Sequence, residues 1–235
     1  MMDVISWRAL RWAGSMALSR QATIRVEGIE HVPERGPVLI AARHFHHLLD
    51  GCALVHAINR PVHIVVGLDW IEGRVFRRVM ESLCRAARWP IVLRPDHPLR
   101  PAAKAGRDAG VREWERRAAL RTSARETASL LGKGRGVIVF PEGYPNIDPS
   151  FTPKSGDEFL PFQPGFVRYA RIAERAGAGP VPIVPAGFAY TRAPESGRWQ
   201  ITLRFGPAVQ VHDSGSDLET VEVVERAVRR LSGEA

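Results

Sequence analysis

The chain has 235 residues, of which 45% are hydrophobic and 25% charged, so it is long enough for one sizeable domain and has the composition of an ordinary soluble globular protein. Lys and Arg outnumber Asp and Glu by 33 to 25, and the net charge of +8 favours an anionic partner such as nucleic acid, an acidic membrane surface or a phosphorylated substrate. Cys52 and Cys84 stand far apart without a CxxC motif, which argues against a disulfide framework or a zinc site and predicts reduced cysteines in a cytosolic protein.

Residues 1–22 predict a helix that is both apolar and basic. Arg8 and Arg11 interrupt the unbroken apolar core that a secretory signal would need. No apolar run in the sequence reaches the roughly 20 residues that a membrane-spanning helix requires. An amphipathic helix with Trp and Arg can pack on its own domain, lie in a membrane interface, or do both. We therefore expect an N-terminal amphipathic helix at residues 1–22 and one domain at residues 23–235.

From residue 37 onwards, short apolar runs typical of buried strands alternate with segments of helical periodicity. The predicted strands are residues 37–42, 62–67, 89–94, 136–143, 181–190 and 198–206. The predicted helices are residues 48–58, 74–87, 110–131, 164–176 and 218–231. This alternation predicts an α/β fold, in which a single domain has a central, mostly parallel, mixed sheet flanked by helices.

Polar residues follow three of the predicted strands, at the carboxyl ends where such sheets place their sites. The stretch from His44 to Asp50 contains three histidines and one aspartate. Arg94 ends the strand 89–94, and Glu142 and Gly143 end the strand 136–143. A carboxylate at Glu142 can accept hydrogen bonds from a polyol, Gly143 lets a ligand approach the backbone, and Arg94 could hold a phosphate by a two-pronged contact.

The histidine cluster suits acid–base chemistry. A histidine can take a proton from a hydroxyl near neutral pH, and a carboxylate on its other ring nitrogen fixes the tautomer and stabilises the imidazolium. No serine or cysteine near the cluster is an evident nucleophile, and the chain has no G-x-S-x-G motif, so direct transfer to a bound hydroxyl is the simplest use. Metal binding by His44, His46 and Asp50, and histidines without a chemical role, are the alternatives.

Taken together, these motifs resemble the glycerolipid acyltransferase family, which includes the lysophosphatidic acid acyltransferases. The similar segments follow one another in the family's order between about residues 28 and 206: EGIEHVPERGPVLIAARH, WPIVLR, FPEG, LPFQPGFVRYA and VPIVPAG. The resemblance implies transfer of a fatty acyl group from coenzyme A or acyl carrier protein, as co-substrate, to the hydroxyl of a lysophospholipid. It implies a histidine base oriented by Asp50, with Arg94, Glu142 and Gly143 binding the acceptor's glycerol and phosphate. No metal or other cofactor is expected.

The first departure from the family concerns the histidine. The family has four residues between its His and its Asp, and that count leads back from Asp50 to Phe45. The position of the strand end selects His44, whereas helical spacing from Asp50 selects His46. We expect His44 to be the base and keep His46 and His47 as alternatives.

The second departure follows the FPEG segment, where the family usually continues with Thr-Arg-Ser and this chain has Tyr144, Pro145 and Asn146. Lys154 or Arg168 could supply the missing positive charge at the acceptor phosphate, or the acceptor could differ. We expect a cytoplasmic enzyme at the inner face of the cell membrane, in contact with anionic lipid and not nucleic acid. A thioester or ester hydrolase and a non-catalytic anionic-lipid-binding protein are the alternatives.

Overall fold

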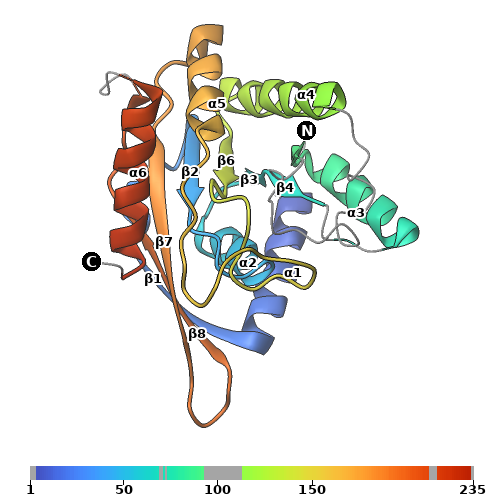
Figure 1. Ribbon diagram of the computed structural model, residues 1–235, viewed down its shortest axis with the longest axis vertical. Helices are drawn as coiled ribbons and strands as arrows, with labels where there is room; N and C mark the ends of the chain where they lie inside the picture. Colours follow the sequence, from blue (N-terminus) through green and yellow to red (C-terminus); the bar gives the residue numbers. More distant parts are fainter. Residues whose placement is uncertain (1–3, 69–70, 72, 93–112, 212–215, 234–235) are drawn as a thin grey trace.

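The computed structural model describes residues 4–68, 71, 73–92, 113–211 and 216–233. Its main sheet has six strands in the described part of the chain (Figure 1). Their order is β1 (Ala22–Glu27), β8 (Trp199–Phe205), β7 (Ile183–Arg192), β2 (Val38–Ala42), β6 (Gly136–Val139) and β3 (Val62–Ile64). Neighbouring strands are parallel except for the antiparallel pair β7 and β8. The predicted mixed, mostly parallel sheet is confirmed.

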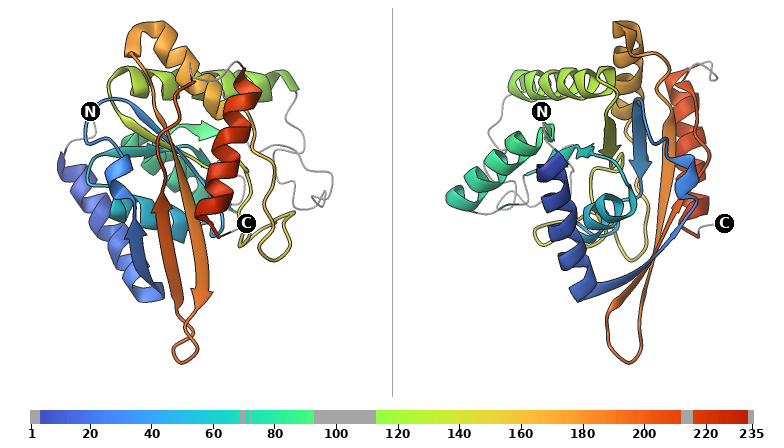
Figure 2. Two further views of the ribbon diagram at one scale, coloured as in Figure 1. Left: turned by 90° about the vertical axis from the view of Figure 1, so that its left-hand side faces the viewer. Right: turned by 180° about the vertical axis from the view of Figure 1, so that it is seen from behind.

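Helices cover both faces of this sheet (Figure 2). One face packs against α1 (Val4–Gln21) and α2 (Leu49–Ala57), and the other against α4 (Glu113–Gly132), α5 (Gly165–Ala173) and α6 (Asp217–Leu231). Successive side chains of β2 alternate between the two cores: Ile40 lies in the first, and Leu39 and Ala41 lie in the second. Every residue of β2 is buried, which explains its continuous apolar run.

The predicted strand 62–67 is in fact two strands in two sheets. Val65 N–H donates to Ile138 O of the main sheet at 2.9 Å, whereas Val66 N–H donates to Pro90 O at 2.9 Å. The chain therefore leaves the main sheet after β3. It then forms β4 (Val66–Gly67), which pairs with β5 (Ile91–Val92) in a separate two-stranded sheet. The helix α3 (Arg74–Ala87) lies between β4 and β5 in the chain and has the predicted bounds.

Strand β1 was not predicted, because its alternation of polar and apolar residues is short and its partner lies far along the chain. Thr23 pairs with Gln200, and Arg204 Nε donates to Glu27 Oε2 at 2.9 Å. The predicted helix 164–176 is confirmed, with α5 at Gly165–Ala173 continuing into a π-helical turn, Glu174–Ala178, whose helical backbone ends before Gly177.

Helix α1 packs on its own domain. Trp7 and Leu18 are buried in the core that α1 shares with α2, and Arg11 donates to His56 O and to Asn59 Oδ1. The described helices include none with the length and apolar character needed to cross a bilayer. Contact of residues 1–22 with a membrane surface stays a prediction.

Candidate active site

The site forms where the parallel strands β2 and β6 end side by side. His44 follows β2, and its backbone N–H donates to Glu142 Oε1, just after β6, at 2.8 Å. The His44 ring stacks on Phe140, with ring centroids 4.3 Å apart. The FPEG segment and the histidine cluster therefore meet at the carboxyl ends of β2 and β6, as we expected from the sequence.

Asp50 accepts four hydrogen bonds and is fully buried. Its Oδ2 atom lies 3.0 Å from His44 Nδ1 and accepts the backbone N–H groups of Phe45 at 2.7 Å and His46 at 2.9 Å. Asp50 Oδ2 already acts as the acceptor for two backbone donors, so we assign the hydrogen of this pair to His44 Nδ1. The residues after His44 turn inward around the carboxylate, and this turn lets His44 reach Asp50 across one residue more than the family spacing.

The fourth donor to Asp50 is Tyr190, which no sequence motif indicated. Strand β7 continues past the end of β2, and Tyr190 near its end donates its hydroxyl to Asp50 Oδ1 at 2.5 Å. Burial, and secondarily the Asp50 charge, raises the pKa of Tyr190 well above its ordinary value. The Tyr190 ring also stacks on Phe45 at 4.4 Å. A tyrosine at the carboxyl end of a predicted buried strand was the one available signal.

His46 is buried just before α2, and the alternative that it is the base stays a prediction. Its Nδ1 accepts the backbone N–H groups of Leu48 at 3.3 Å and Leu49 at 3.4 Å, at the start of α2. Burial lowers the pKa of His46 to about 4, the Asp50 charge only partly opposing it. His47 lies closer to the pocket, and its Nδ1 lies 3.2 Å from Ile147 O.

Glu142 and Lys154, both predicted to bind substrate, contact each other in the structure. Their side chains are fully buried and form an ion pair, with Lys154 Nζ donating to Glu142 Oε2 at 2.5 Å. Lys154 Nζ also donates to His44 O at 2.9 Å, while Glu142 holds His44 N–H. Burial lowers the pKa of Lys154, and Glu142 opposes that shift. The pair therefore clamps the backbone of His44, through its N–H and its C=O. Substrate binding by Glu142 or Lys154 stays a prediction.

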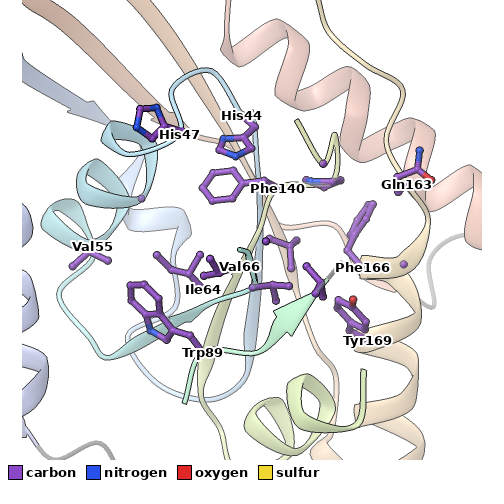
Figure 3. Close-up of a pocket in the computed structure, with 18 of the residues that line it drawn as sticks. His44, His47, Val55, Ile64, Val66, Trp89, Phe140, Gln163, Phe166 and Tyr169 are labelled. Atoms are coloured by element: carbon purple, nitrogen blue, oxygen red, sulfur yellow. The ribbon is translucent and has the colours of Figure 1, made fainter. Parts of the chain in front are cut away.

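A pocket of about 750 Å³ opens beside His44. Figure 3 shows His44 and His47 at one side of the pocket and Trp89 on the opposite side. Its walls are mostly apolar and include Leu10, Val55, Ile64, Val66, Trp89, Leu120, Phe140 and Phe166. Two of the predicted binding residues, Gly143 and Arg168, line it, together with Arg117. Gly143 adopts φ 77°, which suits glycine, in the turn after β6.

The remaining points from the sequence are Arg94 and the metal alternative. Arg94 lies outside the described residues. In the part of the chain that the structure describes, no group of three or more His, Cys, Asp or Glu side chains is arranged to hold a metal ion. Three of the atoms that could bind a metal already accept hydrogen bonds from the protein. They are the two carboxylate oxygens of Asp50 and the Nδ1 atom of His46.

A family model described as Acyltransferase matches residues 23–189, which is most of the chain. The chain belongs to the acyltransferase family. It is thus an enzyme that transfers acyl groups, and the matched segment contains the His44–Asp50 pair, FPEG and β2. No curated protein is similar enough in sequence to be matched.

The acyltransferase fold is also found among solved structures. This chain is similar to the 1-acyl-sn-glycerophosphate (LPA) acyltransferase PlsC from Thermotoga maritima, with a TM-score of 0.60 and 18% sequence identity. The match covers 96% of this chain and 78% of that one. At this identity the likeness shows the shared fold.

Proposed function

We propose that this acyltransferase moves a fatty acyl group from a thioester, on coenzyme A or acyl carrier protein, to the hydroxyl of a lysophospholipid. The observation that carries the proposal is the 3.0 Å contact between His44 Nδ1 and the buried Asp50, beside an apolar pocket of about 750 Å³. A pocket of this size and lining suits a hydrocarbon chain.

In the proposed mechanism, His44 is the general base. Its Nε2 takes the proton of the acceptor hydroxyl while that oxygen attacks the thioester carbonyl. Asp50, hydrogen-bonded to Nδ1, holds the ring tautomer and stabilises the imidazolium. The tetrahedral intermediate then breaks its C–S bond, and the imidazolium returns the proton to the departing thiolate. Products are an ester and a free thiol, and His44 is neutral again.

The head group of the acceptor is proposed to lie near the cationic side chains of the pocket. Arg168 on α5 and Arg117 on α4 line the pocket, and Gly143 is part of its wall. An acceptor phosphate beside these guanidinium groups would be attracted to them. A phosphate-binding role for Arg94 remains part of the proposal. We also propose that the enzyme works at the inner face of the cell membrane, where its net charge of +8 favours anionic lipid.

The experiment measures radiolabelled acyl-CoA turnover by the purified protein with and without lysophosphatidic acid. We expect labelled phospholipid only when the acceptor is present, with little free fatty acid. Equal release of free fatty acid in both reactions would show hydrolysis and overturn the proposal. Other lysophospholipids and an acyl carrier protein donor, run in parallel, identify the preferred head group and carrier.

A further inference from the structure

Helix α3 has more apolar surface than its own domain covers. Val75, Phe76, Val79 and Leu83 are 77%, 53%, 49% and 56% exposed. Their spacing places them along one side of the helix. An adjacent side is already packed, because Cys84 is buried with Leu68 and Ile71 in a small separate core. A continuous exposed apolar band of this kind marks a contact surface.

Exposed large apolar side chains also occur on α1, where Trp12 is 67% exposed, and on α4, where Trp114 is 60% exposed. Figures 1 and 2 show α1, α3 and α4 on the same side of the molecule, away from α6. Exposed apolar side chains on three helices of one side of the molecule suit a lipid interface better than a groove for one peptide.

Basic side chains complete the pattern on α3. Arg78 and Arg85 border the apolar band on the Val75 side, whereas Arg77 lies nearer Cys84 and its side chain is only 24% exposed. Glu81 lies among them, 3.1 Å from Arg77 Nε and 3.8 Å from Arg85 Nη2. A helix with one apolar side and arginines beside it binds in the interface of an anionic bilayer, burying the first and placing the second at the head groups.

We propose that α3 is the membrane-inserting element of this protein and that its partner is an anionic phospholipid bilayer. This inference rests on the membrane association in the proposed function and assigns the surface responsible for it. The same helices form walls of the pocket, through Met80 of α3, Leu10 of α1 and Leu120 of α4. A bilayer docked on α3 therefore lies next to the pocket that would receive a lipid chain.

The test is binding of the full chain to sedimented vesicles of phosphatidylcholine, with and without phosphatidylglycerol. The variant carries Phe76→Ser and Val79→Ser. A matched control carries Ile172→Ser and Leu218→Ser, exposed apolar positions on α5 and α6. We expect the α3 variant to bind roughly tenfold more weakly or worse, from the lost apolar burial, and the control to bind as wild type does. Thermal unfolding should show both variants folded, since all four positions are exposed.

Unchanged vesicle binding by the α3 variant overturns the inference. So does wild-type self-association that the α3 variant abolishes without loss of vesicle binding, because a second copy would then cover the face. Acyl transfer to a short-chain, water-soluble acceptor is measured alongside. The α3 variant should keep this acyl-transfer activity. If the wild-type protein has no such activity, the proposed chemistry is wrong, and the inference about the membrane surface is unaffected.

Discussion

His44 and Asp50 show how single residues set the geometry of this site. Five residues separate them, yet the backbone N–H groups of Phe45 and His46 fold onto the same carboxylate oxygen as His44 Nδ1. The sequence identified both partners, but the choice among three histidines required the turn between them. The turn forms around the Asp50 carboxylate, and the local sequence pattern does not determine the position of that carboxylate.

Tyr190 is expected to act on the reaction through Asp50. The change Tyr190→Phe removes the hydroxyl donor to Asp50 Oδ1 while keeping a ring to stack on Phe45. A lost hydrogen bond to a charged group is worth about 1.5–3 kcal/mol, so we expect kcat to fall about ten- to a hundredfold. The acid limb of the pH–activity profile should move to higher pH, because a carboxylate with one donor fewer attracts the imidazolium more strongly. A purely structural role would leave that limb unmoved.

His46 should make the fold sensitive to acid. Its pKa is lowered from 6.5 in the unfolded chain to about 4 in the fold, so the unfolded state binds the proton first. Above pH 6.5 His46 is neutral in both states and does not reduce the free energy of unfolding. As the pH falls from 6.5 towards 4, the free energy of unfolding decreases by up to about 1.4 kcal/mol per pH unit. The change His46→Asn keeps an acceptor near Leu48 N–H but cannot titrate. Urea unfolding between pH 4 and 6.5 should show that the free energy of unfolding falls less steeply with decreasing pH in the variant than in wild type. If the two proteins lose stability in parallel as the pH falls, the assignment is contradicted.

At the scale of elements, the loop between β6 and α5, residues 140–164, forms a strap that the buried Lys154–Glu142 ion pair holds to the site. Lys154 Nζ reaches Glu142, Asn146 Oδ1 and His44 O, so it joins the strap to the histidine turn. The sequence placed Glu142 at a strand end and named Lys154 as a possible partner of the acceptor phosphate. It could not show that the charge of Lys154 is turned inward, because the partner of a buried lysine is chosen by tertiary structure.

The change Lys154→Met should therefore be costly. It leaves the Glu142 carboxylate buried without its cation, and breaking such pairs costs about 3–5 kcal/mol. We expect that loss in the free energy of unfolding, together with reduced acyl transfer, because the His44 peptide loses one side of its clamp. The double change Glu142→Gln and Lys154→Met should recover part of the stability. If Lys154→Met alone is as stable as wild type, the clamp is not a structural contact.

The elements best predicted from sequence were those whose own pattern decides their structure. Helix α3 has the bounds that its periodicity indicated, and β2 matches its apolar run. The segment 62–67 was read as one strand because its apolar run is continuous, but backbone partners split it between two sheets. Strand β1 was missed because its pairing with β8 joins distant parts of the chain.

At the scale of the whole molecule, the pocket is a joint product of elements far apart in sequence. Its walls come from α1, α2, the small sheet and α5, with His44 at one side (Figure 3). The sequence indicated the chemistry at the sheet edge but not the cavity, since no pattern shows that α1 forms a wall of it.

The pocket should limit the length of the acyl chain. The change Val66→Phe adds volume to the wall without touching the His44–Asp50 pair. We expect the preference for long over short acyl donors to fall several-fold, because the filled pocket excludes terminal methylenes, each worth about 0.8 kcal/mol of burial. Ile172→Phe, on the exposed side of α5, is the control and should keep the wild-type preference. An unchanged chain-length profile for Val66→Phe would place the acyl chain elsewhere.

The central claim is that His44 is the base for acyl transfer to a hydroxyl. The most direct measurement is the rate at which purified wild-type protein and the His44→Ala variant form acylated acceptor from acyl-CoA, with thermal unfolding to confirm that both are folded. General-base catalysis contributes about 10²–10⁴-fold, so we predict at least a hundredfold loss for His44→Ala, with His46→Asn within about tenfold of wild type. A folded His44→Ala variant that transfers acyl groups at the wild-type rate would contradict the claim.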